Sequence, residues 1–360
     1  MAFGGHGGLC DMEVSESPFV SIIIPTYNGG KKLETTLGTC LKIKGVQLEI
    51  LLIDDGSTDG TPDRIERTFP AVKLIRLPTN SGSGAHGRNV GLNLARGRYV
   101  KFLDHDDLIQ PKGFKAECKE ALTSEADIVI SRWGVVPIND SGLFDRSHRR
   151  IFFPPDPTRL VEAILLGEPT PYTAAALYRR TLVSAEKWDA NQTMIDDFDW
   201  FCRMAIKECK VTQVPCISYF WRLHSGSFQA RSHDNETIYR DLMFARFSVY
   251  EKLENQLRNE NRLNPLRQQL LAKRYYQILR CFARYNHAGC DQLLQKIYQL
   301  DPYFLVDATC ESDSRAVWLI RRIGLANFLA TYGRLRRWAD AFPAGRDRQQ
   351  RLRPSDTQAP

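Results

Sequence analysis

The chain has 360 residues, of which 43% are hydrophobic and 25% charged, as is ordinary for a folded globular protein. Its formal net charge of +7 is compatible with an anionic surface or substrate. Basic and aromatic residues do not alternate along a predicted sheet, so we expect no nucleic-acid partner. No apolar run approaches the ~18 residues that span a bilayer, and we expect no secretion signal in the glycine-rich leader. Nine cysteines without a Cys-x-x-Cys pair favour free thiols and a cytoplasmic protein.

Apolar runs alternate with helical patterns in the first third of the chain. Strands are predicted at 19–24, 48–53, 72–76 and 99–103, with helices at 31–41, from 62, and at 90–95. A glycine-rich loop is predicted at 80–89. This alternation predicts an α/β fold with a mostly parallel sheet flanked by helices.

The pattern continues less regularly to about residue 235. Helices are expected at 112–122, 160–166, from 181, and from 196 to about 209, and strands at 126–131, 174–178 and 218–223, with 134–158 irregular. Trp133 is either a platform for an acceptor or an ordinary core residue.

From about residue 237 the pattern is helical, with segments at 239–256, 264–284, 290–300 and 314–341. We therefore divide the chain into a flexible leader (1–17), an α/β domain (18–235, with halves 18–110 and 111–235), a helical extension (236–342) and a disordered basic tail (343–360).

An acidic stretch follows the strand predicted at 99–103: Asp104-His105-Asp106-Asp107. Ligands bind at the carboxyl ends of strands in open α/β sheets. Asp104 and Asp106 are two residues apart, so in extended backbone they point to the same side. Two carboxylates on one side suit a divalent cation beside a diphosphate. The alternative is an acidic turn that only caps the next element.

Four motifs together resemble a known family. They are Ser21-Ile-Ile-Ile-Pro-Thr-Tyr-Asn28, Ile53-Asp-Asp-Gly-Ser-Thr-Asp59, Arg88-Asn-x-Gly91 and Phe102-Leu-Asp-His-Asp-Asp107. In this order and spacing they resemble the family-2 inverting glycosyltransferases, densely over 18–110 and loosely over 111–230. The resemblance implies a GT-A fold that binds a nucleotide sugar.

The resemblance also implies residues for the nucleotide sugar. Contacts to the nucleoside are expected from Pro25, Tyr27, Asn28 and Asp55, with Asp54 as the alternative to Asp55. Arg88 resembles a basic residue near the phosphates, and a planar guanidinium suits two oxygens.

The same resemblance implies a site for Mn²⁺ or Mg²⁺. Asp106 is the expected ligand, and Asp104 contacts the ribose or a metal-bound water. Trp221-Arg-Leu-His-Ser-Gly-Ser227 resembles a loop that closes over the diphosphate. In that loop His224 would complete the metal shell or bind phosphate, and Arg222, Ser225 and Ser227 would supply donors. A structural role for His224 is an equal alternative.

Inverting transfer also needs a base for the acceptor hydroxyl. The family's base often lies in an acidic pair that opens a helix, about 90 residues after the D-x-D. Asp197 fits this position, with Asp196 as the alternative. Both, like Asp199, are also residues that stabilise the first turn of a helix.

These expectations describe a cytoplasmic, metal-dependent inverting glycosyltransferase of polysaccharide biosynthesis. It would move a sugar, from a UDP-sugar by resemblance, to a hydroxyl of a glycan, lipid-linked or protein-linked acceptor. The alternatives are a catalytically inactive nucleotide-sugar-binding scaffold protein and a sugar nucleotidyltransferase. The latter usually has a glycine-rich basic loop after its first strand, where this chain has Pro25-Thr26-Tyr27-Asn28.

The segment 318–338 has apolar residues and arginines at helical spacing. It suits either a helix on an anionic membrane, which would place the protein at the inner face of the membrane, or a helix packed on the domain.

Overall fold

The computed structural model describes residues 19–138, 149–171, 173–224, 235–284 and 289–306, together with Leu325. Contacts divide the chain into two compact units, Met1–Arg262 and Leu263–Pro360. The expected leader, the basic tail, the segment 318–338 with its membrane contact, and residues Ser225 and Ser227 lie outside the described residues. Those predictions therefore stay predictions.

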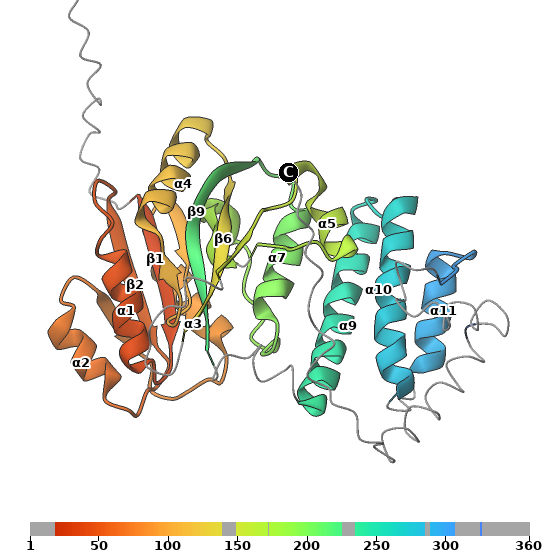
Figure 1. The fold of residues 1–360 in the computed structure, drawn as a ribbon, viewed down its shortest axis with the longest axis horizontal. Coiled ribbons are helices and arrows are strands. Elements are labelled where there is room, and N and C mark those ends of the chain that lie inside the picture. Colours follow the sequence, from red (N-terminus) through yellow and green to blue (C-terminus); the bar gives the residue numbers. More distant parts are fainter. Residues whose placement is uncertain are drawn as a thin grey trace, which may run out of the picture. The chain divides into compact units, whose positions relative to one another are not determined.

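One sheet runs through the first unit (Figure 1). Its described strands follow the order β3-β2-β1-β4-β8-β6-β9-β5, and β7 pairs with β6 outside this path. The strands are β1 Val20–Thr26, β2 Leu48–Asp54, β3 Lys73–Arg76, β4 Tyr99–Phe102, β5 Leu108–Ile109, β6 Ile128–Pro137, β7 Arg150–Phe152, β8 Ala176–Arg179 and β9 Val211–Leu223. The helices of this unit are α1 Gly30–Cys40, α2 Thr61–Thr68, α3 Gly84–Leu94, α4 Pro111–Ser124, α5 Leu160–Leu166, α6 Arg180–Ser184, α7 Asp196–Ile206 and α9 Glu236–Asn259, with 3-10 turns η2 Pro157–Arg159 and η3 Thr173–Ala175.

The first half of the sheet is parallel, as the alternation of strands and helices predicts. Strand β1 pairs in parallel with β2 and β4, and β2 pairs in parallel with β3. The carboxyl ends of these strands therefore meet at one edge. Beyond β4 the sheet is mixed, because β8 is antiparallel to β4 and β6 whereas β9 is parallel to β6. The expected α/β fold is confirmed, with the continuous parallel part in its first half.

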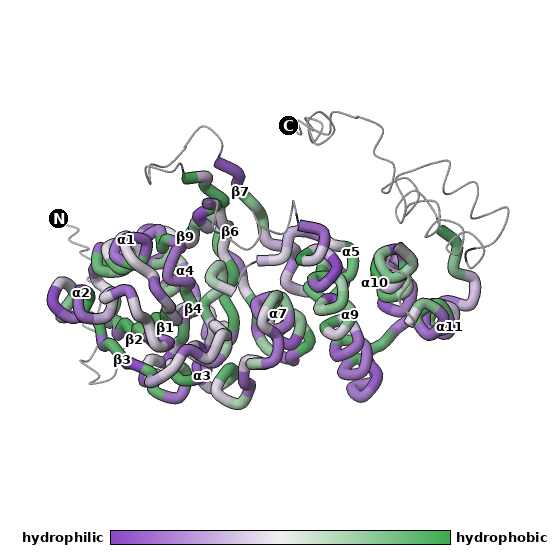
Figure 2. The backbone as a smooth tube through the Cα atoms, turned by 90° about the horizontal axis from the view of Figure 1, so that it is seen from below, coloured by the Kyte–Doolittle hydropathy of each residue, from purple (hydrophilic) through white to green (hydrophobic). Residues whose placement is uncertain are grey.

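Helices cover both faces of this parallel part because alternate residues of β1 point to opposite sides. Ile22 and Ile24 lie in one hydrophobic cluster with Leu37 of α1 and Phe114 of α4. Ile23 points to the other face, where α3 contacts β1. Figure 2 shows these hydrophobic strands between α1 and α4 on one side and α3 on the other. The site at the strand ends thus rests on a core packed from both sides.

Several elements differ from the predicted ranges. Helix α3 begins at Gly84, so half of the predicted glycine-rich loop is helical. Strands β6 and β9 are longer than predicted because they pair with each other along most of their length. Part of the region predicted to be irregular forms β7, and its Phe152 stacks on Trp133 at 5.6 Å between ring centres. Trp133 is 1% exposed, so it is a core residue.

Helix α9 is part of the first unit, although the helical extension was expected to begin at residue 236. Tyr250 contacts Phe198 of α7 at 5.8 Å between ring centres, and Lys252 lies 3.1 Å from Asp199. The second unit contains helices α10 Pro265–Arg284 and α11 Cys290–Leu300. Among the described residues no helix is long and apolar enough to cross a membrane.

Candidate functional site

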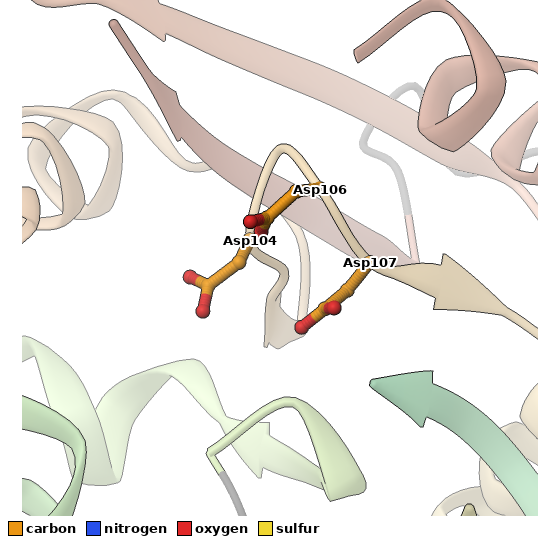
Figure 3. Close-up of side chains that lie close together, drawn as sticks. All are labelled: Asp104, Asp106 and Asp107. Atoms are coloured by element: carbon orange, nitrogen blue, oxygen red, sulfur yellow. The ribbon is translucent and has the colours of Figure 1, made fainter. Parts of the chain in front are cut away.

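The acidic stretch forms a turn directly after β4 rather than extended backbone. The Asp107 amide donates to the Asp104 carbonyl at 3.1 Å. The turn brings Asp104, Asp106 and Asp107 together, with one carboxylate oxygen of each within 4.8 Å of the others. Figure 3 shows the carboxylates of Asp104 and Asp106 turned toward the same side of this turn. Oxygen ligands at this spacing fit a hard divalent cation.

Asp107 anchors this turn from inside the protein. Its carboxylate is buried and accepts hydrogen bonds from the Tyr219 hydroxyl and, at 2.9 Å, from the Arg222 amide. Burial, together with repulsion from Asp106 and Asp104, raises the pKa of Asp107 well above its usual range. Sequence reasoning gave Asp107 no separate role, since its partners lie more than 100 residues later.

His224 lies on the other side of the turn, close to the predicted metal ligand. Its Nε2 lies 3.1 Å from Oδ2 of Asp106, and its Nδ1 lies 3.4 Å from Nζ of Lys32. Burial raises the pKa of Asp106, but the hydrogen bond with His224 and the positive charges of His105, His224 and Arg222 outweigh it and lower the pKa to about 2. Asp106 is therefore ionised, which a metal ligand requires.

Arg222 holds the acidic turn against α1. Its Nε donates to the Asp106 carbonyl, and a terminal nitrogen donates to the Lys32 carbonyl and to the Thr36 hydroxyl, both at 2.8 Å. The side chain is 3% exposed. The structure therefore places Arg222 beside the site, with its Nε and this terminal nitrogen directed at protein oxygens and not at an open pocket.

Arg88 joins the acidic turn to the acidic pair of α7. Its terminal nitrogens lie 2.6 Å from Asp104, 2.6 Å from Asp196 and 3.6 Å from Asp197. Burial lowers the pKa of Arg88, but the three carboxylates outweigh burial and raise it above its usual range. The predicted D-x-D and the predicted base pair are thus brought together through one guanidinium, although 92 residues separate Asp104 from Asp196.

The other residues of the Arg-Asn-x-Gly motif explain how Arg88 reaches this place. A Cβ on Gly91 would lie 2.4 Å from Ile23, so only glycine lets α3 pack this closely on β1. Asn89 donates to the Trp188 carbonyl and accepts from the Trp188 amide, both at 2.9 Å. The motif therefore places α3 against the sheet and joins it to the segment that precedes α7.

Asp196 and Asp197 open α7, as the sequence predicts, and their environments differ. Asp196 makes the short ion pair with Arg88, whereas Asp197 lies further from that guanidinium. Burial and repulsion from Asp104 and Asp196 raise the pKa of Asp197 to about 7, although Arg88 lowers it. A general base works best with a pKa near the ambient pH. Asp197 therefore has the chemistry of a base.

A pocket lies between these groups. Its lining residues are Arg88, Phe102, Asp104, Thr173, Ala174, Asp197 and Tyr219. Asp104 and Asp197 reach it from the β4 turn and from α7. The pocket is too narrow in this structure to admit a substrate, and it marks the place where both carboxylates border one space.

The residues predicted for the nucleoside lie at the carboxyl ends of β1 and β2. Tyr27 is 42% exposed and can stack on a base, whereas Pro25 is buried in β1. Asn28 accepts a hydrogen bond from the Thr58 amide at 2.9 Å and so joins the two loops. Asp54 and Asp55 are buried, and each has an Oδ1 atom without a hydrogen-bond partner among the described residues. These oxygens are therefore able to accept a hydrogen bond from a ligand.

Comparisons with known proteins agree with this geometry. Residues 21–185 match the family model described as glycosyl transferase family 2. The poly(ribitol-phosphate) β-N-acetylglucosaminyltransferase TarP of Staphylococcus aureus is 34% identical over 120 residues, which cover 32% of this chain and only 37% of that protein. The putative glycosyltransferase EpsH of Bacillus subtilis is 26% identical over 268 residues, 71% of this chain and 74% of that protein.

Structural comparison shows the same fold. The structure of residues 1–349 of S. aureus TarS in complex with UDP superposes with a TM-score of 0.55 at 20% identity, covering 89% of this chain and 91% of that one. This similarity confirms the GT-A fold expected for this chain, whose own structure has a mixed sheet flanked by helices and a helical C-terminal part.

Proposed function

Because this chain belongs to glycosyl transferase family 2 through residues 21–185, we propose that it is a metal-dependent inverting glycosyltransferase. It moves a sugar from a UDP-sugar to a hydroxyl of a polysaccharide. One observation carries this proposal. Arg88 forms ion pairs with both Asp104 and Asp196, and it does so beside Asp197 and the pocket.

The residues of the acidic turn fit a divalent cation. Asp106 is held in its ionised form, and Asp104 reaches the same side of the turn. His224 lies within 3.1 Å of Asp106 and is able to join them. Asp107 is the least suited, because its carboxylate already accepts two hydrogen bonds from the protein. If bound by these oxygens, Mn²⁺ or Mg²⁺ would supply positive charge beside the diphosphate of the donor.

Asp197 is the proposed base. It accepts the proton of the acceptor hydroxyl while that hydroxyl attacks the anomeric carbon from the side opposite the diphosphate. One such displacement inverts the configuration at that carbon. Asp196 is less suited to this step because its carboxylate is already held 2.6 Å from Arg88. Burial raises the pKa of Asp196 as well, although Arg88 lowers it.

The donor is proposed to lie along the ends of β1 and β2. Tyr27 stacks on the base, Asn28 holds the loop, and the unpartnered oxygen of Asp55, or of Asp54, accepts a hydrogen bond from the nucleoside. The presence of UDP in the TarS structure supports uridine as the base. Arg88 orients Asp104 and Asp196 rather than reaching the phosphates directly.

The acceptor is proposed to be a glycan polymer. TarP, by its name, transfers N-acetylglucosamine to poly(ribitol phosphate), and the formal charge of +7 suits an anionic polymer. A UDP-sugar donor also supports a cytoplasmic location. The convergence of Asp55, Asp104, Asp106 and Asp197 on one edge argues against an inactive scaffold.

A thermal-shift panel tests this function. UDP, GDP, dTDP and CMP are each added with and without Mn²⁺, and turnover of UDP-N-acetylglucosamine is followed by release of UDP. A ligand that binds the native state raises the melting temperature. We expect the largest metal-dependent shift with UDP and none in Asp106→Ala. A panel in which no nucleotide shifts the wild-type protein, and no UDP is released, would refute the proposal.

A further inference from the structure

Thr173 is a polar residue of the pocket that the sequence did not single out. It begins the η3 turn just before β8 and is 2% exposed. Its hydroxyl has no hydrogen-bond partner among the described residues, yet the residue lines the pocket between Asp104 and Asp197. A buried hydroxyl without a partner is costly, so its retention at a pocket wall points to a partner supplied by a ligand.

A second unpartnered atom lines the same pocket. Oδ1 of Asp197 is buried, lies 3.6 Å from the Arg88 guanidinium and forms no hydrogen bond with a described residue. The Thr173 hydroxyl interacts with this carboxylate and helps to lower its pKa, although neither the Thr173 Oγ1 nor Oδ1 of Asp197 has a partner at normal hydrogen-bond distance and angle among the described residues. The pocket therefore offers one donor and one acceptor side by side.

Nε of Arg88 is another buried donor without a partner on a residue that lines the pocket, but the terminal nitrogens of this guanidinium are already paired with Asp104 and Asp196. The Tyr178 hydroxyl and the Trp200 indole nitrogen are also buried without a partner among the described residues. Their rings pack edge to face at 6.3 Å and pack with Phe102 in an aromatic cluster, and neither residue lines the pocket. Among the described residues that line the pocket, Thr173 therefore carries the unpartnered hydroxyl.

We propose that Thr173 binds the attacking hydroxyl of the acceptor together with Asp197, an assignment that rests on the proposed function. The acceptor hydroxyl donates its hydrogen to Oδ1 of Asp197 and accepts a hydrogen bond from the Thr173 hydroxyl. These two bonds leave a lone pair directed at the anomeric carbon.

The transfer step is balanced by these groups. The acceptor oxygen forms a bond to the anomeric carbon while the bond from that carbon to the diphosphate oxygen breaks. The proton goes to Asp197, and the electron pair of the broken bond leaves with the nucleoside diphosphate. Thr173 changes no bond and orients the nucleophile.

Thr173→Val tests this role because it replaces the hydroxyl by a methyl group of similar size. Thr173→Ser keeps the hydroxyl. Thr212→Val is the matched control, since Thr212 also has a buried hydroxyl without a partner among the described residues but does not line the pocket. Each variant is compared for its affinity for UDP with Mn²⁺, measured by thermal shift. Each is also compared for its turnover of UDP-N-acetylglucosamine with 4-nitrophenyl glycosides of N-acetylglucosamine, glucose and galactose as acceptors.

We expect Thr173→Val to lower kcat/KM for the acceptor about tenfold or more, as for loss of one substrate hydrogen bond. Its UDP affinity should stay within about twofold of wild type. Thr173→Ser and Thr212→Val should stay within about threefold. Where no glycoside is used, water takes the place of the acceptor, and the same comparison is made for donor hydrolysis.

Two results would overturn the assignment. Unchanged turnover in Thr173→Val removes the role, and weakened UDP binding equal to the loss of turnover moves Thr173 to the donor. Failure of the proposed function itself is distinguishable, because it appears in the wild-type protein as absence of UDP binding and of turnover.

Discussion

The guanidinium carbon of Arg88 lies 4.5 Å from the centre of the Trp188 ring. Trp188 in turn stacks on Trp200 of α7 at 4.4 Å between ring centres. Arg88 is therefore held on one side by an aromatic stack and at its end by Asp104 and Asp196. The buried cation thus holds two partly exposed carboxylates close to one another and offsets the repulsion between them.

Replacing Arg88 should first affect stability. Arg88→Ala leaves Asp104 and Asp196 without their cation. Because both carboxylates are partly exposed, we expect a loss of about 2 kcal/mol, which is less than the cost of breaking a fully buried ion pair. The melting temperature should fall by roughly 5 °C. Arg98→Ala is the control, because its pair with Glu125 is exposed. Equal melting temperatures for Arg88→Ala and the wild type would show that the ion pairs of Arg88 with Asp104 and Asp196 do not stabilise the protein.

Asp197→Asn should separate binding from transfer. The amide keeps the shape of the side chain but cannot accept the proton, so turnover should fall by about 10²–10⁴-fold while UDP affinity is retained. Asp196→Asn serves as the comparison, since Asp196 pairs with Arg88. If Asp197→Asn still turns over the donor and Asp196→Asn does not, the two roles are exchanged.

The pH dependence of turnover should report the base. The pKa of Asp197 is raised to about 7, so the carboxylate is protonated below that pH and cannot accept a proton. We expect log kcat to fall by about one unit per pH unit below pH 7 and to level above it. A profile that is flat from pH 5.5 to 8, measured by UDP release, would rule out Asp197 as the titrating base.

Removing the metal should abolish activity. EDTA should eliminate UDP release, and added Mn²⁺ or Mg²⁺ should restore it in the wild type but not in Asp106→Ala. Asp63→Ala is the control, because this carboxylate is 65% exposed and pairs only with Arg76 among the ion pairs of the described residues. Full activity in EDTA would show that the acidic turn works without a cation.

Asp199 should prove important for stability rather than chemistry. It lies in the first turn of α7, as predicted, but is 1% exposed and accepts from Arg203 at 3.0 Å and from Lys252 of α9 at 3.1 Å. Asp199→Asn removes the carboxylate that Arg203 and Lys252 share, but Arg203 keeps its pair with Glu186 and Lys252 keeps its pair with Asp189. We therefore expect a loss of about 1–2 kcal/mol on thermal unfolding. Asp291→Asn, in the first turn of α11 in the second unit, is the comparison. An unchanged melting temperature for Asp199→Asn would show that the ion pairs of Asp199 with Arg203 and Lys252 contribute little to stability.

The α/β class, the parallel first half of the sheet and the edge at which the motifs gather could all be predicted from the amino-acid sequence. These follow from local patterns, because apolar runs of strand length alternate with helical periods and end in Asp, Gly and Asn. The motif around Arg88 was also recognised in the sequence. The structure gives the reason for its residue types, because Gly91 allows close packing on Ile23 and Asn89 forms hydrogen bonds with the Trp188 backbone.

The assembly of the site could not be predicted from the sequence, because it depends on contacts between distant segments. Arg88 was expected near phosphates, but its partners are Asp104 and Asp196, which are distant in sequence. Asp107 and Thr173 gave no signal, because a third aspartate in an acidic turn and a threonine among alanines are common locally. Their meaning depends on burial and on which polar atoms lack a partner, and both arise only when segments far apart in the chain pack together.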